Sequence, residues 1–333
     1  MGRRIHEPRR GSHGFYPRVR ASSLIPRIRT WPEVVGPPRL LGFPVYKVGM
    51  GYVIKTETYQ MSPYHGRDIA KPVTFLEAPP IFIAGIRVYE ENNGALKSLT
   101  EVYAEKLPDK LFRLISKRKR TTNIDEKIKE LYENINRVKE IRIIAATQPY
   151  KTTLGKKTPE LLEIGVSGGN SIKERLDFVK NLLGKEISIK DVFNDGQLVD
   201  VIGVTKGKGF QGVIKRFGVK ELIKWHKHRK GSRKVGAISP QHPSMMRTVP
   251  RPGQMGFHRR TEYNKRIIEI GNDPSKINPS SGFKHYGIIK NNYVIIEGST
   301  PGPAKRILML RYPVRAKPSL LQIPQKVVQI VGG

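Results

Sequence analysis

Three glycines and two lysines in one short stretch have the composition of a phosphate-binding segment. Gly207, Gly209 and Gly212 alternate with Lys206 and Lys208 in the run KGKGFQG. Glycine lets backbone amides approach phosphates closely, and lysine neutralises their charge. The spacing also matches the dinucleotide fingerprint, but no amphipathic helix is expected after it and no acid lies about twenty residues on. We therefore favour contact with a nucleic-acid backbone over binding of a nucleotide cofactor.

An aromatic residue surrounded by cations follows in the same region. Trp225 is followed by His226 and His228, and these cations flank them: Lys224, Lys227, Arg229, Lys230, Arg233 and Lys234. An aromatic side chain among cations is the usual platform for stacking an unpaired nucleobase. Packing of Trp225 on the base of its own loop is an equally good interpretation. The two histidines lack a Cys or an acid cluster to complete a metal shell, so we expect no metal site.

No set of residues in the chain suggests an enzyme. With zero Cys there is no thiol nucleophile, disulfide or thiolate zinc site. Two carboxylates cannot meet in the basic segment, because acids are nearly absent from it. A Ser and His pairing across the fold stays open, but no motif points to it, so we expect no catalytic residues, no cofactor and no small-molecule substrate. The main alternative is an RNA-modifying enzyme whose basic loop binds the RNA substrate, but such an enzyme would need a cofactor pocket or a catalytic acid and base.

The chain carries far more positive charge than solubility requires. Its 333 residues contain 61 Lys and Arg against 28 Asp and Glu, a formal net charge of +33. A compact fold with this charge repels itself, so a polyanion should neutralise it for most of the protein's life. Nucleic acid and an anionic membrane surface both qualify, and phosphate contacts alone do not separate RNA from DNA. A DNA-compacting protein is therefore a second alternative.

Two segments hold most of this charge. Residues 1–30 contain eight Arg, no Lys and one acid, Glu7, and their Gly, Ser and Pro content predicts an extended arm that orders on RNA. Residues 206–266 contain seventeen Lys and Arg against Glu221 and Glu262. Weak hydrophobic periodicity there predicts a long loop that has no core of its own. We expect a polyanion outside the domain to fold this loop.

A neutral stretch has the pattern of an ordinary soluble domain. Residues 121–200 contain thirteen Lys and Arg against thirteen Asp and Glu. The apolar spacing predicts a helix over residues 124–138, capped by Asn123 and Glu126. A second helix is expected to begin at Ser171 and to stop at Gly184. The remaining expected elements are a helical stretch around residues 99–114 and strands over 81–89, 141–147 and 161–166.

Short β-rich runs separated by Gly, Pro and Asn lie on both sides of this stretch, as is typical of a small barrel. These runs are 43–55, 198–205, 266–270, 287–297 and 307–314. Because the strands come from both sides, we expect the neutral region to be an insertion. The expected domains are a basic N-terminal extension over 1–40, a β-barrel over 41–80 and 191–333 interrupted by the loop 206–266, and an inserted α+β subdomain over 81–190.

Membrane association is not expected. No run of about eighteen apolar residues occurs, so no transmembrane helix is predicted. The N-terminus lacks the apolar segment of a secretory signal, and Pro8, Pro17 and Pro26 would prevent the amphipathic helix of a mitochondrial presequence. We expect a cytoplasmic protein.

Three blocks of the basic segment closely resemble, in order and spacing, the central loop of the ribosomal protein L3 family. They are KGKGFQGVIK from Lys206, HRKGSRKVGAI from His228 and RPGQMGFHRRT from Arg251. The run VYKVGM from Val45 looks like that family's first barrel strand. The resemblance extends over nearly the whole chain, including the basic arm and the α+β insertion typical of the archaeal and eukaryotic branches.

This resemblance implies a mixed fold: a small translation-protein-like β-barrel with an inserted α+β subdomain, a basic N-terminal arm and a long basic loop. It implies a structural constituent of the large ribosomal subunit, in the cytoplasm, whose arm and loop bind large-subunit rRNA. Such a protein supports subunit assembly, helps shape the region near the peptidyl transferase centre and packs on neighbouring large-subunit ribosomal proteins. The residues expected to bind rRNA are Arg3, Arg4, Arg9, Arg10, Arg18, Arg20, Lys206, Lys208, Lys215, Arg216, Trp225, His228, Arg229, Lys230, Arg233, Lys234, Gln241, Arg247, Arg251, Gln254, His258, Arg259 and Arg260.

The expected tip of the loop departs from one branch of the family. Gln241 lies beside His242 and Pro243 at the position where eukaryotic relatives have Trp. A mechanism that needs an aromatic tip therefore does not carry over to this chain.

Overall fold

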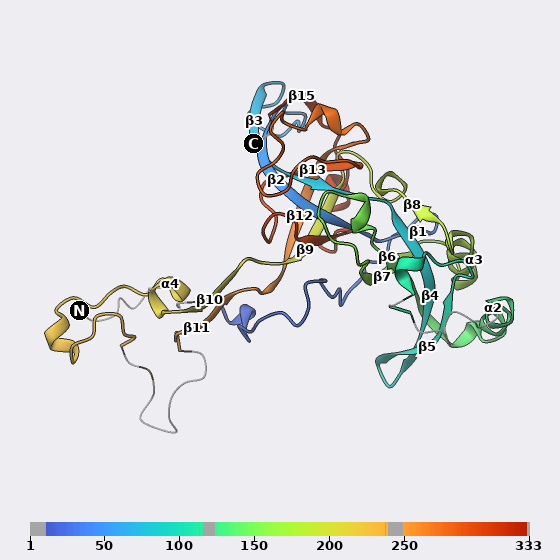
Figure 1. Ribbon diagram of the computed structural model, residues 1–333, viewed down its shortest axis with the longest axis horizontal. Helices are drawn as coiled ribbons and strands as arrows, with labels where there is room; N and C mark the ends of the chain where they lie inside the picture. The colour runs from blue at the N-terminus through green and yellow to red at the C-terminus, as the bar shows by residue number, and fades with distance from the viewer. Residues whose placement is uncertain (1–10, 113, 116–123, 237, 239–248, 332–333) are drawn as a thin grey trace. The chain divides into compact units, whose positions relative to one another are not determined.

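The computed structural model describes residues 11–112, 114–115, 124–236, 238 and 249–331. The chain divides into two compact units. The first unit contains Met1–Ser23 and Val204–Arg260, and the second contains Leu24–Gly203 and Thr261–Gly333. Most regular elements are strands, and the helices are few and short (Figure 1). Among the described residues, no helix is long and apolar enough to span a membrane.

The larger sheet has seven strands in the order β14, β9, β12, β13, β3, β2, β15. Their bounds are β2 Gly42–Thr56, β3 Asp68–Glu77, β9 Leu198–Val204, β12 Arg259–Gly271, β13 Tyr293–Glu297, β14 Ile307–Arg311 and β15 Lys326–Val331. Strand β14 also pairs antiparallel with β2, with Ile307 opposite Tyr46. The path of pairings therefore returns from its first strand to its sixth, and β15 is added outside this ring.

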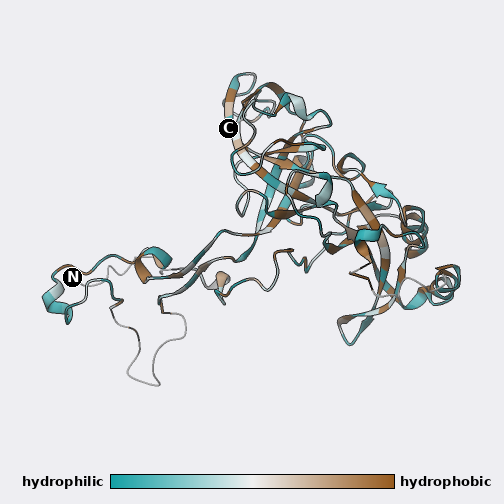
Figure 2. Ribbon diagram, in the orientation of Figure 1, coloured by the Kyte–Doolittle hydropathy of each residue, from teal (hydrophilic) through white to brown (hydrophobic). Residues whose placement is uncertain are grey.

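Burial along β2 follows from these neighbours. Its first half is buried on both faces, since β2 pairs with β14 and β3 and also contacts β7 of the second sheet. Further along, burial alternates: Val53 is fully buried, whereas Tyr52 is 60% exposed. Figure 2 shows the same concentration of apolar residues in the strands. Burial of these side chains supplies most of the driving force for folding.

The second sheet has the order β1, β7, β6, β4, β5, with β8 paired to β4. The bounds are β1 Arg39–Leu40, β4 Ile81–Asn92, β5 Ala95–Tyr103, β6 Val138–Ala146, β7 Leu161–Ser167 and β8 Glu186–Ile187. Helix α2 (Ile124–Glu133) contacts β5, and helix α3 (Ile172–Leu182) contacts β6 and β4. The short 3-10 turns are His13–Phe15, Asp109–Leu111, Ile135–Arg137, Pro149–Lys151, Ile189–Asp191, Trp225–His228, Pro274–Lys276 and Pro318–Leu320.

Most strand predictions are confirmed, with small shifts at the strand ends. The confirmed runs are 43–55 (β2), 81–89 (β4), 141–147 (β6), 161–166 (β7), 198–205 (β9), 266–270 (within β12) and 307–314 (β14). Strands β3 and β15 were not predicted. Pro72 lies inside β3, and because a proline cannot donate a main-chain hydrogen bond, its presence argues against a strand in this part of the sequence.

The helix predicted around residues 99–114 is wrong. Residues up to Tyr103 form β5, which pairs with β4, and a short 3-10 turn follows at Asp109–Leu111. The turn between the two strands is Asn93–Gly94, with φ of 50° and 74°. Both φ values suit the two-residue hairpin turn that Asn-Gly favours. The Asn-Gly pair therefore predicts a hairpin here, and it is a better guide than the apolar spacing that predicted a helix.

The helix predicted over 124–138 is shorter than expected. It ends at Glu133, and Val138 already belongs to β6. Asn123, its expected cap, lies outside the described residues. The second helix is confirmed: the Ser171 hydroxyl accepts a hydrogen bond from Glu174 N at 3.2 Å. Gly184, with φ of 77°, follows its end.

The strand predicted over 287–297 begins only at Tyr293. The preceding residues are held instead by a fully buried carboxylate. Glu77 Oε1 accepts hydrogen bonds from the main-chain N–H groups of Lys290 and Asn291, both at 3.0 Å. These amides are therefore taken by a side chain rather than by a neighbouring strand.

The first unit has more regular structure than the sequence predicts. Strands β10 (Gly207–Gln211) and β11 (Gly253–Gly256) pair antiparallel, and helix α4 (Val213–Phe217) directly follows the glycine run. The sequence predicted no amphipathic helix after Gly212, and the helix that does follow, α4, has only five residues. The loop predicted to end at residue 266 is also too long, because β12 begins at Arg259.

Candidate nucleic-acid interface

In the first unit, the N-terminal arm lies along the base of the basic loop. Ala21 N donates to the carbonyl of Phe257 at 2.8 Å, and His258 Nδ1 lies 2.8 Å from the carbonyl of Val19. Phe257 N in turn donates to Lys206 O at 3.1 Å. The arm is thus bonded to the C-terminal end of the loop, and that end is bonded in turn to the N-terminal end at Lys206.

Stacking between arginine and aromatic side chains adds to these backbone contacts. The Arg18 guanidinium of the arm lies 4.6 Å from the ring centroid of Phe217 in α4. In the second contact the arginine and the ring come from the other partners: the Arg260 guanidinium lies 4.4 Å from the ring centroid of Phe15 in the arm. Each such contact contributes roughly 0.5–1 kcal/mol at an exposed site. They fix the direction of guanidinium groups that would otherwise be free to rotate.

These contacts gather four basic groups: Arg18, Arg216, His258 and Arg260. Burial lowers the pKa of His258, and repulsion from the three arginines lowers it further, partly offset by the bond to Val19. Burial and repulsion from Arg18 likewise lower the pKa of Arg260. These shifts mean that the cations repel one another. A bound anion would remove this repulsion.

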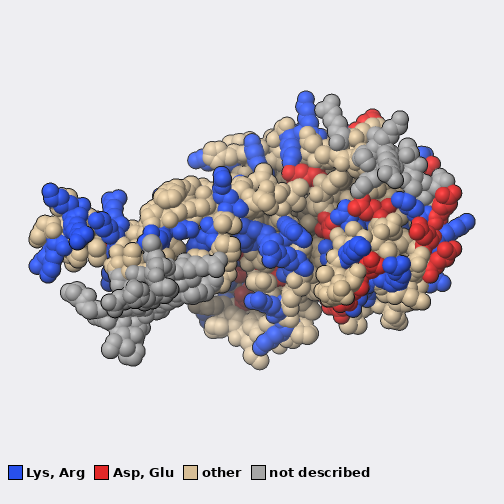
Figure 3. Space-filling view, turned by 90° about the horizontal axis from the view of Figure 1, so that it is seen from below, with Lys and Arg blue, Asp and Glu red and all other residues tan. Residues whose placement is uncertain are grey.

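Acidic side chains do not neutralise this cluster within the part of the first unit that the structure describes. The one acid there is Glu221. Its Oε1 accepts a hydrogen bond from Ser232 at 2.7 Å and lies 3.8 Å from Arg233 Nε. On the face drawn in Figure 3, Lys and Arg of the second unit are interleaved with Asp and Glu, whereas the first unit shows Lys and Arg alone. The arrangement is therefore suited to binding phosphate groups.

Comparison with known proteins agrees with this chemistry. The family model described as Ribosomal protein L3 matches residues 1–328 of the chain. The chain belongs to the ribosomal protein L3 family. The large ribosomal subunit protein uL3 of Pyrobaculum islandicum is 53% identical over 318 residues, which cover 95% of this chain and 93% of that protein. The proteins of the same name from Caldivirga maquilingensis (95% and 92% covered) and Methanocaldococcus jannaschii (98% and 96% covered) are 52% and 50% identical.

The blocks that resemble the ribosomal protein L3 family fall almost wholly in the first unit. KGKGFQG forms β10 and the entry to α4. Its backbone needs glycine at Gly209, where φ is 65°. Gly256 in β11 has φ of 72°, and a Cβ there would lie 2.1 Å from the carbonyl oxygen of Lys206. Gly256 thus lets the two strands approach closely, while Lys208 is exposed to solvent.

Arg216 has a structural role that the sequence did not reveal. Its Nε donates to Gln254 O at 3.0 Å, and its Nη1 donates to Arg251 O at 2.8 Å. The side chain therefore ties α4 to the returning strand of the loop. Gln254 in turn donates through Nε2 to Gly256 O at 3.0 Å, so both residues expected to bind rRNA also hold the loop together.

Trp225 is 52% exposed at the start of a 3-10 turn. Three neighbouring cations adopt left-handed backbone conformations, with φ of 64° at Lys224, 49° at Arg229 and 54° at Lys230. Such conformations cost roughly 1–2 kcal/mol for a residue with a side chain. A second exposed aromatic residue, Phe210, is 77% exposed beside Lys208 and was not among the expected RNA-binding residues.

The structure places the described candidates in one unit but does not bring all of them together. Arg18, His258 and Arg260 meet as described, whereas Trp225 and His228 lie in the 3-10 turn Trp225–His228 and Arg233 lies beside Glu221. Six candidates lie outside the described residues: Arg3, Arg4, Arg9, Arg10, Gln241 and Arg247. In the described part of the chain, no three His, Cys, Asp or Glu side chains are grouped as a metal site would require.

Proposed function

We propose that this chain is a structural component of the large ribosomal subunit, acting in the cytoplasm, and not an enzyme. Its arm and basic loop would bind large-subunit rRNA, support subunit assembly and help shape the region near the peptidyl transferase centre. Neighbouring ribosomal proteins are the other expected partners. Family membership supports the ribosomal role, since the relatives are named large ribosomal subunit proteins.

The convergence of Arg18, Arg216, His258 and Arg260 is the observation that carries the proposal of rRNA binding. The cluster combines mutual repulsion with fixed guanidinium directions, and the described part of the unit offers it no neighbouring carboxylate. Arginine pairs well with phosphate because its planar group donates two parallel hydrogen bonds. Backbone phosphates at a fixed spacing would therefore suit this surface better than a diffuse anionic layer.

We also propose that the six-stranded ring of the second unit is the small β-barrel of translation proteins. Strands β2 and β3 precede residues 81–190, and β9 and β12 to β14 follow them. The α+β region over 81–190 would then be an insertion, joined at its sheet edge by β1 at Arg39–Leu40. The barrel over 41–80 and 191–333 and the arm over 1–40 complete the proposed domains, with the loop interrupting the barrel between residue 206 and the start of β12 at Arg259.

The decisive experiment measures binding to large-subunit rRNA fragments by filter retention, together with co-sedimentation with large subunits after a high-salt wash. The double variant Arg18→Gln and Arg260→Gln should bind rRNA at least about tenfold more weakly, because two phosphate contacts are lost. The matched control is Lys173→Gln and Lys180→Gln, which removes the same charge from exposed positions of α3. Equal losses in both variants would show that total charge, not the cluster, determines binding, and loss of the chain in the salt wash would contradict the ribosomal role.

A further inference from the structure

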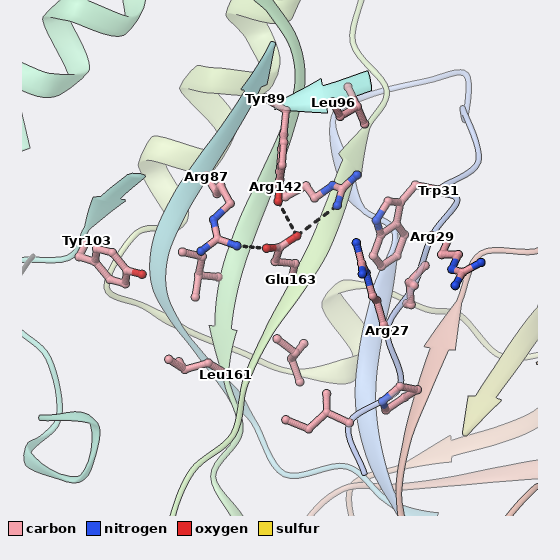
Figure 4. Close-up of a pocket in the computed structure, with 15 residues that line it drawn as sticks. Arg27, Arg29, Trp31, Arg87, Tyr89, Leu96, Tyr103, Arg142, Leu161 and Glu163 are labelled. Atoms are coloured by element: carbon pink, nitrogen blue, oxygen red, sulfur yellow. Dashed lines mark hydrogen bonds and ion pairs between the residues drawn. The ribbon is translucent and has the colours of Figure 1, made fainter. Parts of the chain in front are cut away.

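The second unit contains a large cavity outside the surfaces described above. Its volume is about 930 Å³, which falls within the usual range of roughly 300–1,000 Å³ for small-ligand sites. It lies between the chain segment Ile25–Trp31 and the face of the second sheet opposite helices α2 and α3 (Figure 4). Four arginines and one glutamate are among its lining residues.

The floor of the cavity is a network of hydrogen-bonded charged side chains centred on Glu163. Glu163 Oε2 accepts hydrogen bonds from Tyr89 OH at 2.8 Å and from Arg142 Nη1 at 3.1 Å, and its other oxygen accepts from Arg87. Arg142 also binds both carboxylate oxygens of Glu140 at 2.9 Å, and its guanidinium lies 4.5 Å from the ring centroid of Tyr89. Figure 4 shows the three side chains converging on Glu163. Because this carboxylate is already engaged, the floor has little need of a further cation.

Trp31 forms a side wall next to this floor, and two glycines leave room for its ring. A Cβ at Gly165 would lie 2.6 Å from Trp31 Cγ, and one at Gly42 would lie 3.1 Å from Cζ3. The indole therefore lies directly on the backbone of the sheet strands. Leu96 and Leu161 also line the cavity, so its side walls are apolar and its floor is polar.

Two buried donors at this cavity have no acceptor among the described residues: Trp31 Nε1 and Arg87 Nε. A buried donor without a partner costs roughly 1–3 kcal/mol. Figure 4 shows the indole nitrogen on the edge of Trp31 that faces Arg142. An occupant that carries acceptors would therefore remove this cost.

The mouth of the cavity is positively charged. Arg27 and Arg29 are exposed residues of the arm segment, and Figure 4 shows the Arg27 guanidinium directed toward Glu163 and Arg142, with Arg29 further out. An occupant should thus combine a flat body, acceptors on its buried edge and negative charge at its outer end. A nucleotide has all three properties: an aromatic base, ring and carbonyl acceptors, and a phosphate.

We propose that this cavity binds one unstacked nucleotide of the RNA, with its base against Trp31 and its phosphate near Arg27. The site extends RNA recognition to the charge-balanced part of the chain and rests on the proposed function. It differs from the cluster in the first unit because it reads a base rather than backbone phosphates alone. An acidic peptide segment is the competing occupant, and the experiment below separates the two.

Trp31 fluorescence in the full chain can report occupancy directly. The chain has two Trp, so Trp225→Phe leaves Trp31 as the sole reporter. The four nucleoside 5′-monophosphates are titrated separately at roughly 0.5 M salt, where backbone contacts are weak. Ribose 5-phosphate tests for an anion site alone, and a short acidic peptide tests the competing occupant. We expect saturable quenching by at least one nucleotide and none by ribose 5-phosphate.

Two variants test the assignment, each with a control of equal charge change. Arg27→Gln should weaken nucleotide binding about tenfold, as expected for a lost charge-assisted contact, whereas Arg137→Gln, on the same subdomain outside the cavity, should not. Leu96→Asp should also weaken it by repelling phosphate at the mouth, whereas Lys97→Gln should leave it unchanged. The proposal is overturned by no quenching, by equal quenching with ribose 5-phosphate, by tighter binding of the peptide or by unchanged binding in both cavity variants. If rRNA binding persists in any of these cases, the nucleotide site alone is refuted.

Discussion

Arg216 Nη1 donates a hydrogen bond to the main-chain carbonyl of Arg251 at 2.8 Å. This bond links α4 to the returning strand of the basic loop, so a residue chosen for its charge also closes the loop. The neighbouring cation, Lys215, is exposed and makes no hydrogen bond of this kind in the described structure. The pair therefore separates the effect of charge from the effect of structure.

We predict that Arg216→Ala and Lys215→Ala reduce the salt dependence of RNA binding by a similar amount, since each removes about one phosphate contact. Only Arg216→Ala should also loosen the loop, because two carbonyl bonds are lost. Hydrogen exchange of residues 207–217 and 249–256 in the free protein measures this difference. Equal exchange in the two variants would show that the bonds from Arg216 do not hold the loop.

The total number of phosphate contacts sets the salt dependence of the wild type. If arm and loop together neutralise ~10 phosphates, the logarithm of affinity should fall with the logarithm of salt concentration at a slope of about −7 to −9. Removing residues 1–23, which supply the arm of the first unit, should flatten this slope. A slope near about −2 would contradict extensive backbone contact, and the Lys173→Gln and Lys180→Gln control should keep the wild-type slope.

His258 predicts a pH dependence of both stability and binding. Burial and three nearby arginines lower its pKa in the folded protein. As pH falls below about 6.5, the usual histidine value, the unfolded chain takes up a proton before the folded chain does, so acid should destabilise the first unit. Urea unfolding of the wild type and His258→Gln between pH 7.5 and 5.5 should show a smaller loss in the variant.

RNA should oppose this effect, because phosphates near Arg18, Arg216 and Arg260 would cancel the part of the lowering of the His258 pKa that comes from repulsion, although not the part that comes from burial. Binding should therefore be accompanied by proton uptake, and affinity should rise as the pH falls toward about 6. Calorimetry in two buffers of different ionisation enthalpy measures the proton count. An identical count in His258→Gln would assign the uptake to another group.

How far the sequence could predict these features depends on how local their causes are. The Ser171 cap and Gly184 stop of α3 depend on neighbouring residues, and they were predicted correctly. The late start of β13 depends on Glu77, which lies more than two hundred residues away and takes two of the amides before Tyr293. No short stretch of sequence contains both Glu77 and the amides that it binds. Hydrophobic periodicity therefore could not have predicted that β13 begins only at Tyr293.

The candidate site shows the same division. Charge and the family resemblance identified Arg18, Arg216 and Arg260 as separate cations, but the stacking of Arg18 on Phe217 and of Arg260 on Phe15 appears only when the arm lies along the loop. The cavity beside Trp31 was missed entirely. Its signal was Gly165, a glycine in the middle of a strand, which often marks the close approach of another group.

A buried ion pair should control the stability of the second unit. Arg311 Nη2 lies 2.7 Å from Asp200 Oδ2, and Asp200 also accepts from Asn264 N at 3.0 Å. Asp200→Ala should destabilise the unit by about 3–5 kcal/mol, because it leaves the buried Arg311 charge without a carboxylate, although its hydrogen bond to Thr30 O remains. Replacing both residues, with Asp200→Leu and Arg311→Met, should cost less than Asp200→Ala. Thermal unfolding followed by circular dichroism measures both, and a double variant less stable than the single one would contradict this account.

Trp225 offers the sharpest test of how the outer loop meets RNA. The indole is 52% exposed, so packing on the loop accounts for only part of its surface, and stacking on an unpaired base could use the rest. Such stacking contributes about 1–3 kcal/mol per base, so Trp225→Ala should weaken binding of a single-stranded rRNA fragment at least about fivefold. Trp225→Phe should retain most of the affinity, because any aromatic face can stack. If both variants bind like the wild type while the hydrogen exchange of residues 222–232 rises only in Trp225→Ala, the side chain packs on its own loop and does not contact a base.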